Sequence, residues 1–224
     1  MYLQSGAQCS FQIGGDRLRI AVPPGCSHAF AHTFEDVCAG IRCVESLQEG
    51  QDFLKVLDIL LRNLLPKVGD SFSFGDAQVQ FLSPMKEYSN INDSSIVVRI
   101  IHGINTFLFA GDAEWEAEHD MVDSGYDLSA TVLKVGHHGS DTSSSYVFLR
   151  EVMPKYAVIS CGEGNSYGHP TEAVLSRLRD VGAQVFRTDL QGDVVFVSDG
   201  TTLSFGTEKY ADAQMLWKSG GVTN

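Results

Sequence analysis

The sequence predicts an α/β (α+β) protein built as an αββα sandwich, in which two packed sheets carry helices on their outer faces. Two observations favour this class. Hairpin signals join neighbouring strands in the first half of the chain, and strands alternate with helices in the second half. The 224 residues contain no repeat and no linker rich in proline, glycine and serine. We therefore expect a single domain over residues 1–224.

The first predicted elements are a hairpin and a long helical stretch. Strands at Ser10–Ile13 and Arg17–Val22 flank the turn sequence Gly14-Gly15-Asp16. From about Phe34 to Leu65, apolar residues recur at three- and four-residue spacing, which predicts an amphipathic helix that ends before Pro66.

Strands and shorter helices fill the remainder of the chain. The predicted strands are 77–82, 95–101, 106–110, 130–135, 156–160, 184–187, 193–197 and 202–205. The predicted helices are 114–122, 146–152, 171–181 and a C-terminal helix near 211–218. Hairpins and strand–helix units in one chain are typical of packed sheets with helices outside.

Charge and composition limit the function classes. A net charge of −12 disfavours a broad nucleic-acid-binding surface, because phosphate contacts dominate such affinity. Nucleic acid stays open as a partner if metal ions supply positive charge locally. No apolar run reaches the roughly 18 residues needed to span a bilayer, and no export signal is visible, so we expect a cytoplasmic protein. The five cysteines form no Cys-x-x-Cys pair, which favours reduced thiols.

Four polar sequences follow apolar runs, where predicted strands end. They are Phe109–Ala113, Lys134–Ser140, Asn165–Pro170 and Arg187–Gly192. Ligands of open α/β sheets collect at such strand ends, and Asp and His side chains there suit a divalent ion. Each sequence alone also has an ordinary interpretation, since Gly-Asp after a strand often forms a turn and a single His is usually structural.

His137 and His138 are adjacent in the second of these sequences. Neighbouring side chains of an extended strand point to opposite faces, so the two cannot both bind one ion from extended backbone. We expect one of them to ligate, and the other to contact substrate or support the ligands.

The order of these sequences resembles the metallo-β-lactamase superfamily, specifically the β-lactamase-like domain of ComEC-type competence (DNA-uptake) proteins. The matching sequences, in order, are Asn92-Asp93-Ser94-Ser95, Leu108-Phe109-Ala110-Gly111-Asp112-Ala113, Leu133 to Ser140, Asn165 to Pro170 and Thr188 to Gly192. The resemblance extends over roughly residues 68–200 and rests on five ordered motifs rather than on any single histidine.

The resemblance implies a dinuclear zinc or manganese site, at which a metal-bound hydroxide attacks a phosphodiester or related ester. Asp112 would bridge the ions, and one of His137 and His138 would be the late metal ligand. His169 would lie near the leaving group or bind the substrate's phosphate. The predicted catalytic residues are thus Asp112, His138 and His169. The predicted substrate-binding residues are Asn92, Ser140, Asn165 and His169.

The N-terminal third departs from the family pattern. Residues 1–67 form a degenerate part, followed by a well-matched part (68–207) and a C-terminal tail with a helix (208–224). In the metal-binding loop of the family, His32 and Asp36 would keep two ligand positions, whereas Phe34 and Val37 cannot coordinate. An equally weighted interpretation is a polar loop with a capped helix start. Whether one ion or two would bind stays open.

Other polar residues near the motifs have structural interpretations. His102 lies at a predicted hairpin turn and His119 in an acidic helix, so we expect both to be structural. The acidic run after Asp112, from Glu114 to Glu118, is expected to be a solvated helix face near a helix N-terminus.

Three functions compete at this point. The first is a metal-dependent hydrolase with a reduced or rearranged site. The second is a binding or regulatory module that keeps the fold but not the catalytic metal site. The third is a truncated product of a full-length hydrolase. Retention of the four late motifs favours the hydrolase. The connection between residues 25 and 32 is too short for the helix and strand that intervene in the family, which favours the other two.

Overall fold

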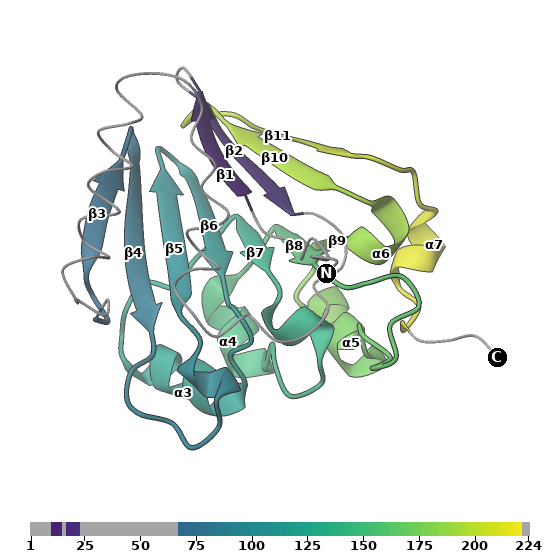
Figure 1. Ribbon diagram of the computed structural model, residues 1–224, viewed down its shortest axis with the longest axis horizontal. Helices are drawn as coiled ribbons and strands as arrows, with labels where there is room; N and C mark the ends of the chain where they lie inside the picture. Colours follow the sequence, from purple (N-terminus) through teal and green to yellow (C-terminus); the bar gives the residue numbers. More distant parts are fainter. Residues whose placement is uncertain (1–9, 15–16, 23–66, 221–224) are drawn as a thin grey trace, which may run out of the picture.

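The computed structural model describes residues 10–14, 17–22 and 67–220 (Figure 1). The predicted helical stretch 34–65 and the candidate ligands His32 and Asp36 lie outside these ranges. Among the described residues, two sheets and a layer of helices build the fold.

The larger sheet has seven strands in the order β3-β4-β5-β6-β7-β8-β9. They are β3 (Ser71–Phe74), β4 (Ala77–Ser83), β5 (Val97–His102), β6 (Asn105–Phe109), β7 (Val132–Lys134), β8 (Tyr156–Ile159) and β9 (Gln184–Arg187). Strands β3 to β6 pair antiparallel, whereas β6 to β9 pair parallel.

The parallel strands β6 to β9 are paired so that their last residues lie opposite, or within one residue of, one another. Phe109 of β6 lies opposite Lys134 of β7, and Lys134 lies opposite Val158 of β8. Ile159 of β8 lies opposite Arg187, the last residue of β9. The four strands therefore end at nearly the same height, and the loops that follow them meet at one edge of the sheet.

The smaller sheet has four antiparallel strands in the order β1-β2-β10-β11. They are β1 (Ser10–Gly14), β2 (Arg17–Val22), β10 (Val194–Ser198) and β11 (Leu203–Thr207). The predicted N-terminal hairpin is thus confirmed, and it pairs with the end of the chain through β2 and β10.

Alternation along the central strands separates two apolar cores. In β6, Phe107 faces the smaller sheet, and Leu108 faces the helices, as neighbours in a strand must. The inter-sheet core includes Tyr156, Phe186 and Phe196, with the Phe186 and Phe196 ring centroids 5.5 Å apart. The other core lies under α3 (Trp115–Asp123), α4 (Tyr146–Val152) and α5 (Glu172–Asp180), which cover the opposite face of the larger sheet (Figure 1). The predicted α/β sandwich is therefore confirmed.

Some elements differ from the sequence prediction. Strand β3 and the short helix α6 (Thr188–Gln191) were not predicted. The predicted strand at 130–135 is only β7, three residues long. The C-terminal helix is shorter than predicted and spans Ala213–Leu216, as α7. Among the residues described, no helix has the length and apolar character needed to cross a membrane.

Two hairpin turns hold the sheets together at one end. The backbone N–H of Ile104, between β5 and β6, donates to Gly200 O, between β10 and β11, at 2.7 Å. Ser198 Oγ lies 2.9 Å from His102 Nδ1 and accepts from Asn105 Nδ2 at 2.9 Å. His102 is buried, which agrees with the structural role expected for it.

A buried carboxylate joins α3 to the start of α4. Glu118 is 0% exposed and accepts hydrogen bonds from the backbone N–H groups of Ser144 and Ser145, the latter at 2.7 Å. Arg177 of α5 donates to the carbonyls of Asp141 and Ser143 in the same loop. The expectation of a solvated acidic face is therefore wrong for Glu118, whose partners lie 26 and 27 residues away. Burial raises the pKa of Glu118 to about 7.

We predict that Gly103→Ala destabilises the fold more than Gly125→Ala does. Both glycines have positive φ, which costs an alanine roughly 1–2 kcal/mol. A Cβ on Gly103 would also lie 2.0 Å from Gly200 O, whereas nothing lies within 4 Å of a Cβ on Gly125. Urea unfolding should show the larger loss of unfolding free energy for Gly103→Ala. Equal losses would contradict the close contact between the two turns.

We also predict a pH dependence of stability that Glu118→Gln removes. Because the folded-state pKa is about 7 and the ordinary value is 4.5, the folded protein holds a proton that the unfolded chain releases in this window. Raising the pH from 4.5 to 7 therefore lowers the free energy of unfolding of the wild type relative to Glu118→Gln. Urea unfolding at several pH values measures this difference, and a constant difference would refute the assignment.

Candidate functional site

Asp112 lies at the edge where the parallel strands end. Its backbone N–H donates to Ser95 Oγ at 3.1 Å, and the residue is 9% exposed. The preceding Gly111 has φ +56°, and a Cβ there would lie 2.9 Å from the Cβ of Ser95. Glycine thus permits both the left-handed backbone and the close approach that turn Asp112 towards the edge.

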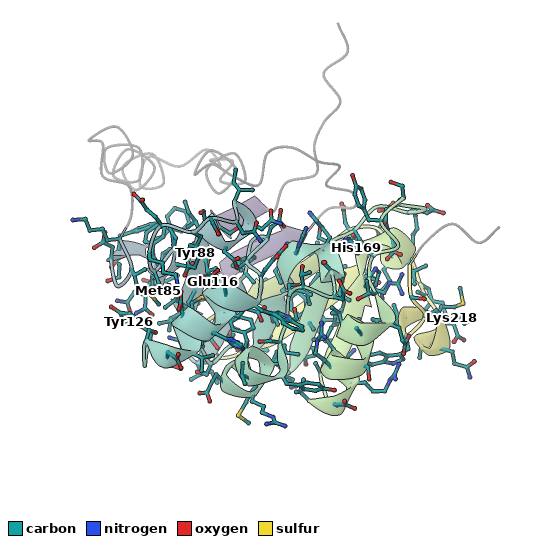
Figure 2. All side chains as sticks on the ribbon, turned by 90° about the horizontal axis from the view of Figure 1, so that it is seen from below. Met85, Tyr88, Glu116, Tyr126, His169 and Lys218 are labelled. Carbon is teal, nitrogen blue, oxygen red and sulfur yellow. The ribbon has the colours of Figure 1, made fainter. Side chains whose placement is uncertain are left out.

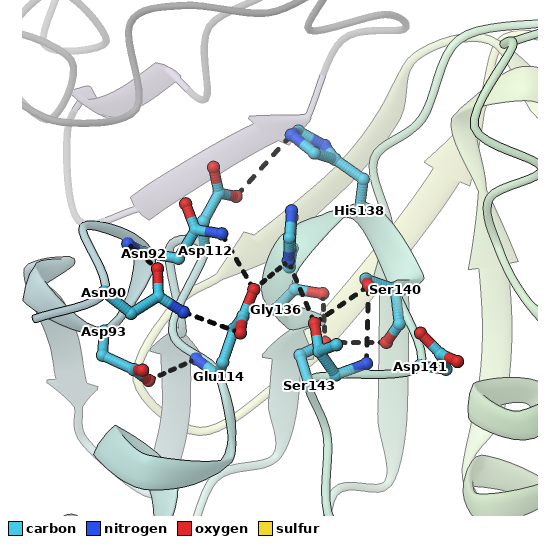
Figure 3. Close-up of polar contacts among 12 residues, drawn as sticks. Asn90, Asn92, Asp93, Asp112, Glu114, Gly136, His138, Ser140, Asp141 and Ser143 are labelled. Atoms are coloured by element: carbon cyan, nitrogen blue, oxygen red, sulfur yellow. Dashed lines mark hydrogen bonds and ion pairs between the residues drawn. The ribbon is translucent and has the colours of Figure 1, made fainter.

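His138 approaches Asp112 from the loop after β7. Its Nδ1 lies 2.7 Å from the carbonyl oxygen of Ser160, and its Nε2 lies 3.6 Å from Asp112 Oδ1 (Figure 3). A carbonyl oxygen can only accept, so Nδ1 carries the proton and Nε2 keeps its lone pair. Burial, and next the positive charge of Lys134, lower the pKa of His138 to about 4. The imidazole is therefore neutral at physiological pH.

The contact between His138 and Asp112 is consequently not an ion pair at neutral pH. A lone pair on Nε2 faces a carboxylate oxygen, with no proton between them. An imidazole nitrogen with a free lone pair and a carboxylate oxygen are ligand atoms that divalent cations bind. Ligand atoms roughly 2.0–2.2 Å from a tetrahedral ion lie about 3.3–3.6 Å apart, which agrees with the separation of 3.6 Å. These two residues therefore fit a metal ion.

His137 turns to a different carboxylate. Its Nδ1 lies 3.1 Å from Glu114 Oε1 and 3.4 Å from Thr142 Oγ1. The backbone is not extended here, since His137 has φ 45° and His138 has φ 55°. The expectation that the two rings diverge is met, but the cause is this left-handed backbone rather than a strand.

Glu114 belongs to a polar cluster in front of α3. Its two carboxylate oxygens accept from the Nδ2 groups of Asn90 and Asn92, each at 2.8 Å. The backbone N–H groups of Glu114 and Ala117 donate to Asp93 Oδ1, so a side chain distant in sequence caps the helix. The side-chain amide of Asn92, a predicted substrate-binding residue, thus donates its hydrogen bond to Glu114.

The loop that carries His169 is braced by Asn165. The Asn165 side chain accepts from the backbone N–H of His169 at 3.0 Å and donates to its carbonyl oxygen at 2.7 Å. The ring of His169 lies 6.0 Å from that of His137 and stacks on Tyr167 at 5.9 Å. His169 is thus beside His137, while the amide of Asn165 holds the loop.

Ser140 and the last motif support neighbouring loops. Ser140 is buried, and its hydroxyl lies 3.0 Å from Thr142 Oγ1. Arg187 forms a buried bidentate pair with Asp189, with nitrogen–oxygen distances of 3.0 and 2.6 Å. Thr188 Oγ1 bonds the backbone of Cys161. These contacts tie the ends of β8 and β9 together.

The structure therefore brings four predicted site residues together, Asp112, His137, His138 and His169. Within residues 67–220, no three His, Cys, Asp or Glu side chains converge closely enough to hold a metal ion by themselves. Sequence reasoning missed Glu114 as a partner of His137 and Ser160 as the carbonyl behind His138. No local pattern marks either contact, because both join residues more than 20 positions apart.

Comparisons with known proteins agree with these features. The model of the metallo-beta-lactamase superfamily matches residues 45–163. Competence protein ComA of Neisseria gonorrhoeae is 47% identical over 120 residues, which are 52% of this chain and 17% of that protein. ComE operon protein 3 of Bacillus subtilis is 37% identical over 131 residues, 58% of this chain and 17% of that protein. The chain spans about a sixth of the length of these relatives.

A solved structure of a mutant CmlA β-hydroxylase aligns with a TM-score of 0.38 and 13% identity, over 57% of this chain and 32% of that chain. The resemblance to ComEC-type competence proteins, inferred from five ordered motifs, is confirmed by the sequence relatives. Since the family model matches more than half of its residues, the chain belongs to the metallo-beta-lactamase superfamily.

Proposed function

We propose that this chain is a metal-dependent hydrolase that acts on a phosphodiester or related ester. One observation carries the proposal: the lone pair of His138 Nε2 faces Asp112 Oδ1 across 3.6 Å, while Ser160 O holds the opposite ring nitrogen. A backbone carbonyl behind a ligating histidine is the usual support of a metal site.

Asp112 and His138 would hold the metal, and zinc or manganese suits an imidazole nitrogen combined with a carboxylate oxygen. When bound, the ion would activate water and stabilise negative charge on the ester oxygen. A catalytic zinc usually has three protein ligands. We propose that His32 or Asp36 completes the set, for one ion or two.

The protein's own groups would position the substrate beside this pair. His169, in the loop braced by Asn165, lies next to His137 and would contact a phosphate or the leaving group. Ser140 and Asn92 would act through the loops and side chains that they hold. The net charge of −12 makes nucleic acid a less favoured substrate, and a bound cation would supply local positive charge for an anionic ester.

A binding or regulatory module is the second candidate. It is favoured by the observation that, within residues 67–220, no group of three or more His, Cys, Asp or Glu side chains could hold a metal ion. Such a module would bind phosphate at the His137 and His169 edge without hydrolysing it.

We predict that the wild type, purified without a histidine tag, contains about one equivalent or more of zinc or manganese and hydrolyses bis-p-nitrophenyl phosphate. Asp112→Asn and His138→Gln should each lose metal affinity by roughly 100-fold or more, since even a residue behind a ligand can cost 10- to 100-fold. Elemental analysis and hydrolysis rates measure both effects. Asp123→Asn and His119→Gln are matched controls, because both residues are exposed on α3.

The outcomes separate the candidates. A metal-free wild type that stays inactive after manganese is added would refute the hydrolase. Metal-independent phosphate binding that is lost in His169→Ala would support the binding module instead.

A further inference from the structure

The carboxylate of Glu114 is held from both sides. Asn92 Nδ2 donates to Oε1 and Asn90 Nδ2 donates to Oε2, each at 2.8 Å, and His137 Nδ1 lies 3.1 Å from Oε1 (Figure 3). The backbone N–H of the same residue is held by Asp93. The rotamer of Glu114 is therefore fixed, and both of its oxygens are occupied by partners other than Asp112 and His138.

This arrangement fixes the ring of His137. A carboxylate oxygen can only accept a hydrogen bond, so it favours a proton on Nδ1. Nε2 is then the ring atom left for another partner. The ring centroid lies 6.4 Å from that of His138 and 6.0 Å from that of His169, so His137 neighbours both the metal-binding pair and the loop that carries His169. Its side chain is 25% exposed, which leaves it accessible.

The backbone supports a functional interpretation. His137 has φ 45° and ψ 44°, a left-handed conformation that a histidine adopts at some energetic cost. The backbone N–H of His137 donates to Gly111 O at 3.0 Å, which ties this strained residue to the turn that carries Asp112. The loop after β7 thus directs the ring of His137 to Glu114 and the ring of His138 to Asp112.

We propose that Glu114 is a positioning residue, which fixes the orientation and tautomer of His137 so that Nε2 of His137 contacts the substrate. In this assignment His138 belongs to the metal site and His137 to the substrate side. The assignment rests on the proposed hydrolase function, and it gives separate tasks to two histidines that are both candidate metal ligands in the sequence.

Glu114→Gln tests the assignment, because it keeps the size of the side chain and removes its charge. We expect kcat to fall about 10- to 100-fold while metal content stays at the wild-type level, as for a group that acts behind another side chain. Glu116→Gln is the matched control. Glu116 lies on the same helix, pairs with Lys86 at the surface, and is well apart from His169 in Figure 2. It should leave kcat within about twofold of the wild type.

A spectroscopic measurement tests the tautomer directly. In protein labelled with ¹⁵N-histidine, with the His137 signals assigned by their loss in His137→Gln, long-range ¹H–¹⁵N spectra should show the proton on Nδ1. Glu114→Gln should weaken that preference, and Glu116→Gln should not. A merely structural role of Glu114 would change thermal stability without changing the tautomer.

Three results would overturn the assignment. One is a loss of metal in Glu114→Gln comparable to that in Asp112→Asn, which would place Glu114 in the metal site. Another is an unchanged kcat in Glu114→Gln. The third is a wild-type His137 protonated on Nε2. If the wild type bound no metal and hydrolysed nothing, the proposed function would fail, and the positioning role would be decided by the tautomer spectra alone.

Discussion

The parallel pairing of β6, β7, β8 and β9 is the constraint on which the arrangement of the candidate site depends. Parallel neighbours in level register end at one edge of a sheet, so four loops that are distant in sequence begin side by side. Asp112 follows β6, the two histidines follow β7, and Ser160 directly follows β8. An antiparallel partner in place of β7 would send its loop to the opposite edge and separate Asp112 from His138.

The loops at this edge are irregular, and buried polar side chains hold them in place. Asp93 caps α3, Glu118 accepts two backbone N–H groups at the start of α4, and Arg177 bonds two carbonyls of the loop between them. Irregular backbone under the surface must find partners for its N–H and C=O groups. Here the helices supply them through side chains, so the loop between the histidines and α4 has a defined path. A site needs such support to keep its reacting groups within a fraction of an ångström.

Much of the fold could be predicted from periodicity, because burial imposes it on the sequence. The alternation of β6 and the apolar run before Asp112 identified strands whose partners were unknown. Contacts between distant side chains could not be predicted in this way. The acidic run that contains Glu118 has the composition of a solvated face, and only the packing of α4 against α3 shows that one of its carboxylates is buried. Likewise, Ser71–Phe74 alternates polar and apolar residues over only four positions, and its pairing with β4 identifies it as a strand.

The histidine pair illustrates why residue identity alone does not define a role. The sequence indicated that His137 and His138 would diverge, and the argument was that of an extended strand. The divergence arises from two successive left-handed residues, and it sends the rings to different carboxylates. What then distinguishes the two is the group in front of each ring. A carbonyl behind His138 and a carboxylate behind His137 both leave a lone pair on Nε2, but the Nε2 of His138 also faces the carboxylate of Asp112 at 3.6 Å, which suits a cation. Two carboxylates at one edge of an acidic protein repel an anionic ester. For the proposed ester substrate, a cation held by Asp112 and His138 would offset this repulsion.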